Sequence, residues 1–418
     1  MSVLGIELGS TRIKGVLIDE SRRFIQSGIY NWENRLENGY WTYPLGEVWT
    51  GIKNVISQLD EPLDISQFAA VGISAMMHGY LVFDKNGELL VPFRTWRNTN
   101  TEAAALKLTE LFGFNIPLRW SVAHLYQAIL NGEEHTEKID YITTLAGYVH
   151  WKLTGEKVLG ICDASGMFPI LNGAYNPQYV KLFQNLTGIN WPQIAPKILK
   201  AGEYAGAYRG ISFCPPEGDA GTGMTATNSV APRTGNVSAG TSIFAMVVLE
   251  KPLSKVYPEI DILSTPSGSD VAMAHYNECT SKIDPWINLF AEAFEFMGVK
   301  VSRDELFKRL YESALGETKL SRFMRKLLTD AVGELVKGVN ILAEHESVRI
   351  NSFAGHGGFF KSGTAGQTIL SELLGVPVSL TDTAAEGGAW GMALLADYMS
   401  HNNISLEEYL CKIYQRSN

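Results

Sequence analysis

Cysteine is scarce in this chain of 418 residues, and basic clusters and long apolar runs are missing from it. The four cysteines, Cys162, Cys214, Cys279 and Cys411, lie far apart and form no Cys-x-x-Cys pair. This pattern excludes a disulfide framework and a thiolate metal site. No run reaches the length of a membrane span, and no basic segment precedes the apolar opening at residues 3–8. We therefore expect a protein of the reducing cytoplasm with no membrane partner.

The charge balance is acidic, with 35 Lys and Arg against 44 Asp and Glu and a net charge of -9. Proteins that bind a nucleic-acid backbone need clustered positive charge, so we expect no nucleic-acid partner. Hydrophobic residues make up 45% of the chain and charged residues 19%, which is typical of a folded globular protein. At roughly 150 residues per domain, the length predicts two to three domains.

Glycine is abundant, with 40 residues, and two glycine turns lie in matching surroundings. Residues 3–8 and 13–18 predict two strands joined by the Gly-Ser-Thr turn at 9–11. A similar strand-turn-strand pattern recurs at residues 235–250, with Gly-Thr-Ser at 240–242. One repeat spaced by half the chain predicts a duplicated domain rather than a solenoid. We expect two mixed α/β domains, residues 1–231 and 232–418.

The two turns are built from small and hydroxyl-bearing residues. Such a turn lets backbone N–H groups and short hydroxyls converge on an anion, because no large side chain blocks the approach. A single turn of this kind is more often an ordinary hairpin tip. Two matching turns, one per domain, favour a polyphosphate held between them.

Three further segments carry candidate chemistry. Asp219 lies among glycines before a predicted helix, where a carboxylate can cap the helix or accept a proton from a substrate hydroxyl. His78 follows the strand-like run 69–73, the place where α/β folds bind ligands, although a lone histidine is more often structural. Three glycines in the four residues 355–358 exceed what a helix entry needs and favour close passage of the chain past a nucleotide.

Together these segments resemble the FGGY family of carbohydrate kinases. Residues 5–14 are similar to its first phosphate loop, 238–242 to its second, and 215–223 to the Gly-Asp segment that carries the catalytic base. Residues 74–80 are similar to the Gln-Met-His-Gly segment of xylulose kinases, with Ala75 or Met76 in place of Gln. The resemblance runs from residue 5 to residue 398. It implies a two-domain, actin-like (ribonuclease H-like) α/β ATPase fold with a cleft between duplicated domains.

The resemblance also implies roles for individual residues, with ATP and Mg²⁺ as cofactors. Asp219 is the expected catalytic base, and with Glu7, where the family usually has Asp, it is expected near the metal. The expected sugar-binding residues are Met77, His78, Gly79, Trp96, Asn98 and Trp120. The expected ATP-binding residues are Gly9, Ser10, Thr11, Arg12, Lys14, Gly240, Thr241, Ser242, Gly355, Gly357, Gly358 and Phe359.

The chain departs from the family pattern in a few places. Asn98 stands where the family's Trp-x-Asp-x-Arg element has Asp, which removes a charge. For Trp120, core packing is nearly as good an interpretation as sugar binding. The segments 205–211 and 315–321 are shorter than in family members, and the loss of lid or nucleotide contacts there would leave a degenerate kinase.

The expected activity is that of a xylulokinase-like enzyme: ATP-dependent phosphorylation of a ketopentose, with D-xylulose converted to D-xylulose 5-phosphate. The alternatives are L-ribulose or another ketose or polyol as acceptor, a nucleotide-switched actin-like binding protein, and a degenerate kinase. The expected partners are the sugar and ATP, and a homodimer is the commonest assembly for such a protein. The fold alone does not select the sugar.

Overall fold

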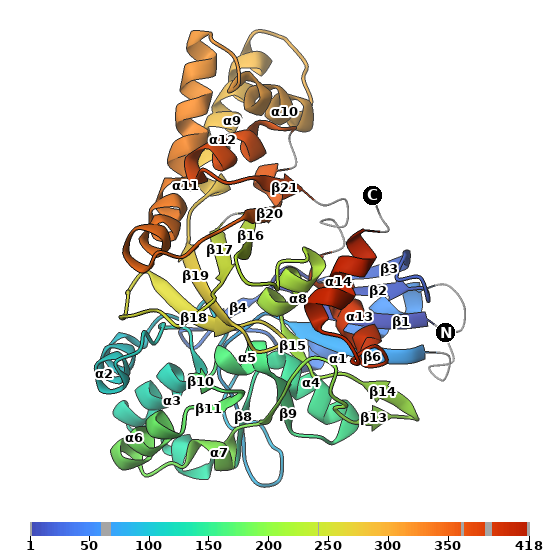
Figure 1. Ribbon diagram of the computed structural model, residues 1–418, viewed down its shortest axis with the longest axis vertical. Helices are drawn as coiled ribbons and strands as arrows, with labels where there is room; N and C mark the ends of the chain where they lie inside the picture. Colours follow the sequence, from blue (N-terminus) through green and yellow to red (C-terminus); the bar gives the residue numbers. More distant parts are fainter. Residues whose placement is uncertain (1, 60–67, 241, 361–362, 381–386, 416–418) are drawn as a thin grey trace. The chain divides into compact units, whose positions relative to one another are not determined.

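The structure is a computed structural model that describes residues 2–59, 68–240, 242–360, 363–380 and 387–415. The chain forms two compact units (Figure 1). Unit 1 consists of Met1–Val230, Ile262–Asp270 and Glu386–Asn418, and unit 2 consists of Ala231–Asp261 and Val271–Ala385. Within the described residues, no helix combines the length and the apolar character that crossing a bilayer requires.

Unit 1 is built on a seven-stranded sheet with the order β13-β14-β6-β1-β2-β3, in which β15 also pairs with β6. These strands are β1 Ser2–Leu8, β2 Arg12–Ile18, β3 Phe24–Asn31, β6 Phe68–Ala75, β13 Ala207–Tyr208, β14 Ile211–Phe213 and β15 Glu217–Gly218. Four small two-stranded sheets pair β4 Arg35–Glu37 with β5 Tyr40–Thr42, β7 Leu81–Phe83 with β8 Tyr141–Thr143, β9 Val158–Gly160 with β12 Lys197–Leu199, and β10 Ile170–Leu171 with β11 Ala174–Tyr175.

Unit 1 contains α-helices and a short 3-10 helix. They are α1 Leu45–Gln58, α2 Glu102–Phe112, α3 Ser121–Leu130, the 3-10 helix η2 Glu134–Lys138, α4 Leu145–Thr154, α5 Ile161–Ser165, α6 Pro177–Thr187, α7 Trp191–Ile194, α8 Asp219–Ala226, α13 Gly387–Tyr398 and α14 Leu406–Tyr414. In α1, Val48, Ile52 and Val55 are buried at spacings of four and three, so one face of the helix packs on the core.

Helix α13 lies close to strand β1 because glycine opens the space. A Cβ placed on Gly5 would lie 2.1 Å from the carbonyl oxygen of Ala389 in α13. Gly15 faces the other way, toward Val55 of α1. Since successive strand residues point to opposite faces, α1 and α13 cover opposite faces of the sheet.

Unit 2 supplies most of a six-stranded sheet with the order β18-β19-β17-β16-β20-β21, to which residues 262–264 and 270 of unit 1 also belong. Its strands are β16 Thr234–Ala239, β17 Ile243–Val248, β18 Ile260–Ser264, β19 Asp270–Tyr276, β20 Ser352–His356 and β21 Val378–Leu380. Its helices are α9 Thr280–Phe296, α10 Arg303–Ser313, α11 Lys319–Glu346, the 3-10 helix η3 Gly358–Phe360, and α12 Ala365–Leu374.

The two sheets repeat one strand arrangement. In unit 1, β1 pairs antiparallel with β2 and parallel with β6. In unit 2, β16 pairs antiparallel with β17 and parallel with β20. This is the duplication of an α/β unit that the two glycine-turn hairpins predicted.

The compact units differ from the expected domains 1–231 and 232–418 in two places, since residues 262–270 and residues 386–418 both group with unit 1. The change of unit at Val230 and Ala231 lies beside the expected boundary, but α13 and α14 group with unit 1. Local sequence patterns carry no information about which sheet a distant helix covers. The division into two folding domains stays a prediction.

Candidate active site

A row of polar side chains crosses the sheet of unit 1. Glu7 on β1 lies opposite Lys14 on β2 and opposite Ser74 on β6. Lys14 and Ser74 are buried. Residues paired across neighbouring strands share a face of the sheet, and for Glu7 this is the face that Gly5 turns toward α13. The predicted metal and phosphate residues Glu7 and Lys14 therefore lie side by side.

Glu7 lies against the first turn of α13. A Cβ on Gly388 would lie 2.4 Å from Glu7 Oε1, and the Ala389 backbone N–H donates to the carboxylate. Burial and then the charge of Asp219 raise the pKa of Glu7 to about 7, against the opposing effects of Arg12, Ala389 and Lys14. A bound cation would favour the ionised form.

Asp219 is the first residue of α8, where it can also interact with the helix N-terminus. Its Oδ1 accepts a hydrogen bond from the Met77 backbone N–H at 3.2 Å. Burial raises the pKa of Asp219 to about 6, and the N–H groups of Met77 and Ala220 oppose that shift. The carboxylate is thus largely ionised at pH 7 with a pKa near neutrality, which suits a general base.

Thr222, one turn along α8, connects Asp219 with the row on the sheet. Its Oγ1 lies 3.2 Å from Ser74 Oγ. A Cβ on Gly388 would lie 2.7 Å from Thr222 Oγ1. The hydroxyl groups of Thr222 and Ser74 therefore occupy the space beside the Glu7 carboxylate.

A second pair of acids supports the segment that leads into Asp219. Glu217 is buried and accepts hydrogen bonds from the backbone N–H groups of Asp163 (3.0 Å) and Cys162 (3.4 Å). Burial raises the pKa of Glu217 to about 8. Asp163 is also buried, and its Oδ2 accepts from the Thr144 hydroxyl at 2.6 Å. Burial raises the pKa of Asp163 well above its usual range, and the hydrogen bond from Thr144 opposes that shift.

The loop after β6 places His78 beside Trp120. His78 has a left-handed backbone, with φ +66°, and Gly79 follows at φ +95°. The ring of His78 is stacked near Trp120, with centroids 6.4 Å apart, and its Nδ1 lies 3.0 Å from the Gly166 carbonyl oxygen. A left-handed non-glycine residue is a strained conformation that often marks a functional position.

Two further predicted sugar contacts differ in their surroundings. Trp120 is fully buried, and within the described residues its indole N–H has no hydrogen-bond acceptor. Asn98 is buried, and its amide bonds backbone groups: Oδ1 accepts from Trp41 N–H, and Nδ2 donates to the carbonyls of Trp41 and Thr95. These contacts occupy the amide of Asn98, so the geometry favours a structural role for it.

The first glycine turn is held from one side by aromatic residues. Trp32 Nε1 donates to the Gly9 carbonyl at 2.7 Å, and the Tyr43 hydroxyl donates to the Ser10 carbonyl at 2.6 Å. Trp96 Nε1 donates to Ser10 Oγ at 3.2 Å. The predicted sugar residue Trp96 therefore contacts the predicted phosphate turn. Thr11, which completes the turn, is exposed together with Arg12.

Unit 2 brings its own two glycine segments together. Gly357, at φ +104°, packs against Ala239, where a Cβ would lie 2.4 Å from the Ala239 carbonyl oxygen. Gly240 follows Ala239, and its N–H donates to the Ser242 carbonyl at 2.8 Å. Gly358 faces open space within the described structure. Thr241 lies outside the described residues.

The remaining predicted nucleotide residues of unit 2 are packed inside it. Phe359 is fully buried beside Tyr311 and Phe360. A Cβ on Gly355 would lie 2.9 Å from the ring of Phe360. Their surroundings favour core packing over contact with a ligand.

Four residues of this region were given no chemical role from the sequence: Ser74, Thr222, Glu217 and Asp163. Ser74 lies inside the segment 74–80, and Glu217 and Thr222 lie inside the segment 215–223, where Glu217 precedes Asp219 by two positions. Thr222 follows Asp219 by three positions, and this one-turn helical spacing could have pointed to a shared helix face. Their convergence depends on strand pairing, which a single sequence does not reveal.

The donor set near Glu7 and Asp219 suits a nucleotide-bound Mg²⁺. Proteins hold this ion through one or two carboxylates together with waters and phosphate oxygens. The charges of Glu7 and Asp219 are coupled. In the part of the chain that the structure describes, no group of three or more His, Cys, Asp and Glu side chains could hold a metal ion. Two neighbouring carboxylates fit an ion that arrives with phosphates, as nucleotide-bound Mg²⁺ does.

Family models match the chain twice. Residues 2–227 match the N-terminal domain of the FGGY family of carbohydrate kinases, and residues 296–400 match its C-terminal domain. The chain belongs to this family. The actin-like ATPase fold of FGGY kinases agrees with the two-unit α/β architecture, which confirms the expected fold class.

Individual relatives are distant. The xylulose kinase of Lactococcus lactis subsp. lactis is 27% identical over 182 residues, which cover 39% of this chain and 35% of that protein. A xylulose kinase structure from Brucella ovis superimposes with a TM-score of 0.80 at 17% identity, covering 100% of this chain and 98% of the other. A glycerol kinase structure from Plasmodium falciparum with ADP reaches 0.81 at 14% identity, covering 99% and 92%. The chain thus matches about a third of the Lactococcus enzyme by sequence, and the structures establish the fold alone.

Proposed function

We propose that this FGGY protein is an ATP-dependent carbohydrate kinase that phosphorylates a hydroxyl group of a ketopentose, with D-xylulose as first substrate and L-ribulose as second. The observation that carries the proposal is the placement of Asp219. Its carboxylate begins α8, accepts from the Met77 N–H and has a pKa raised to about 6. A phosphoryl acceptor needs such a group to orient its hydroxyl and take up the proton.

Asp219 performs the proton transfer in this mechanism. The carboxylate accepts the proton of the attacking hydroxyl as the new P–O bond forms, and the ADP oxygen leaves with the electrons of the broken P–O bond. Met77 keeps Asp219 Oδ1 in place through the backbone hydrogen bond.

Glu7 and Asp219 are the residues that would hold Mg²⁺. When bound, the ion neutralises charge on the phosphates of the nucleotide. Lys14, paired with Glu7 across the strands, adds a positive charge on the same face of the sheet. The turn at residues 9–11 would bind phosphate through the backbone N–H groups and hydroxyls of Ser10 and Thr11, because the Gly9 N–H already donates to the Arg12 carbonyl. The turn at residues 240–242 stays a predicted phosphate contact.

The sugar would lie near His78 and Trp120. His78 has a strained, left-handed backbone, and Trp120 offers a buried N–H with no acceptor in the described structure. Both observations favour a polar ligand at this place. The xylulose kinase relatives support a ketopentose, whereas the glycerol kinase neighbour makes glycerol the necessary comparison.

The test is an acceptor panel. ATP consumption and product formation are measured with D-xylulose, L-ribulose, D-ribulose, glycerol and no acceptor. We expect turnover with the ketopentoses, fastest with D-xylulose. ATP hydrolysis that does not depend on an acceptor would instead support a nucleotide-switched protein, and sugar or ATP binding without turnover would support a degenerate kinase.

A further inference from the structure

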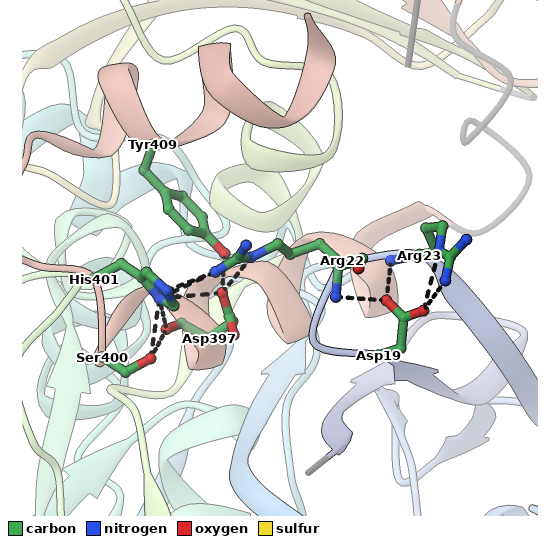
Figure 2. Close-up of polar contacts among 8 residues, drawn as sticks. Asp19, Arg22, Arg23, Asp397, Ser400, His401 and Tyr409 are labelled. Carbon is green, nitrogen blue, oxygen red and sulfur yellow. Dashed lines mark hydrogen bonds and ion pairs between the residues drawn. The ribbon is translucent and has the colours of Figure 1, made fainter. Parts of the chain in front are cut away.

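A cluster of side chains joins the end of α13 to the turn between β2 and β3 (Figure 2). Asp397 Oδ2 accepts from Arg22 Nε at 2.9 Å and from the Tyr409 hydroxyl at 2.6 Å. Arg22 Nη2 donates to Nε2 of His401 at 2.6 Å, since a guanidinium offers no acceptor. Asp397 is 9% exposed. We call Arg22, Asp397, His401 and Tyr409 the clasp.

The clasp is made by tertiary contacts rather than by its own turn. Arg22 has a left-handed backbone, with φ +63°, which costs a non-glycine residue energy. Its neighbour Arg23 instead pairs with Asp19 within the same turn, and the Arg23 side chain is 78% exposed. Figure 2 shows the two pairs next to each other. The same turn therefore supplies a buried long-range pair and an exposed local pair.

The opposite end of α13 touches Glu7. The Ala389 N–H donates to the Glu7 carboxylate, and Gly388 leaves no room for a side chain beside it. Between its two ends α13 is buried. Gly391 packs on α8, where a Cβ would lie 2.0 Å from the Thr222 carbonyl oxygen. A helix this tightly packed transmits a displacement at Asp397 to its first turn, roughly 14 Å away at 1.5 Å per residue.

Strand β2 connects the clasp with the same carboxylate by a second route. It carries Lys14, which lies opposite Glu7, and it leads into the turn that holds Arg22. Binding Arg22 to Asp397 thus fixes β2 and α13 relative to each other, and Glu7 lies between them. Burial and the adjacent Asp397 carboxylate raise the pKa of Tyr409, so its hydroxyl stays protonated and donates.

We propose that Arg22 and Asp397 are positioning residues that hold the first turn of α13 against Glu7 and thereby set the place of this carboxylate for nucleotide-bound Mg²⁺. The inference rests on the proposed kinase function. According to this proposal, the clasp lowers the Mg²⁺ concentration that the reaction needs, in addition to any effect on the stability of the fold.

The experiment compares Arg22→Ala with the matched control Arg23→Ala. One measurement, made without ligand, is hydrogen–deuterium exchange of peptides covering residues 387–398. The other is the kinase rate as a function of free Mg²⁺ at fixed ATP. For Arg22→Ala we expect exchange in the first turn of α13 to rise at least tenfold, and the Mg²⁺ concentration for half-maximal rate to rise at least fivefold. The KM for the sugar should stay within twofold, and Arg23→Ala should match the wild type in every measurement.

Unchanged exchange and unchanged Mg²⁺ dependence in folded Arg22→Ala would overturn the proposal. A loss of thermal stability without either change would overturn it too, because the clasp would then be purely structural. If Arg22→Ala does not fold, Asp397→Asn takes its place, since it keeps the shape of the side chain and removes the charge. Absence of sugar phosphorylation in the wild type would contradict the proposed function, while the exchange measurement would still decide the role of the clasp.

Discussion

The backbone N–H of Met77 donates a hydrogen bond to Asp219 Oδ1 across 3.2 Å. This bond joins the loop after β6 to the first residue of α8. The same loop continues into the left-handed residues His78 and Gly79. The proposed base and the proposed sugar-binding residues therefore share one support, and a change in one is expected to affect the other.

Asp219→Asn should remove the base with little change in shape. We expect kcat to fall by about 10²- to 10⁴-fold, the usual contribution of a general base, while ATP binding is preserved. The measurements are steady-state kinetics with D-xylulose and calorimetric titration with ATP. Asp84→Asn, in an exposed turn of the same unit, is the control and should keep full activity. Retention of most sugar-kinase activity in Asp219→Asn would contradict the assignment.

Gly391→Ala should destabilise unit 1. Its Cβ would lie 2.0 Å from the Thr222 carbonyl oxygen and 3.1 Å from the Ala226 nitrogen, and both are backbone atoms that cannot move aside alone. We expect a loss of about 1–3 kcal/mol in the free energy of unfolding, measured by urea titration. Gly333→Ala is the matched control in the interior of α11, where an added Cβ meets open space. It should gain up to about 1 kcal/mol, and an equal response of the two variants would contradict the tight α8–α13 contact.

The pH dependence of stability should report the buried acid Glu217. Burial raises its pKa in the folded protein from 4.5 to about 8. Between these values the folded state keeps the proton that the unfolded state has lost. The contribution of Glu217 is therefore fully present below pH 4.5 and is lost as the pH rises through about 8.

Glu217→Gln should flatten this dependence between pH 7 and 8, where Glu217 adds a slope of up to about 1.4 kcal/mol per pH unit. The measurement is urea unfolding at several pH values. Glu305→Gln is the control, because the hydrogen bond from Arg309 lowers the pKa of Glu305 and the group is ionised in both states in this range. An identical slope in wild type and Glu217→Gln would mean that Glu217 is ionised in the folded protein.

Much of the architecture follows from local sequence patterns. Apolar runs on both sides of the glycine turn at 9–11 indicate the first hairpin, and a similar pattern at 235–250 indicates the second. The spacing of Val48, Ile52 and Val55 determines the amphipathic face of α1. These features depend on neighbours in the chain, so the sequence by itself determined them.

Contacts between distant segments were decided only by the tertiary structure. Asn98 satisfies its amide against the backbone of Trp41, 57 positions away, and α13 returns to the first unit to meet Glu7. The raised pKa values of Glu7, Asp219 and Glu217 arise from burial, which depends on what packs around each carboxyl group. The sequence therefore determined the helices and strands and the family pattern. Long-range packing decided which of the predicted site residues have their polar groups hydrogen-bonded to other parts of the protein.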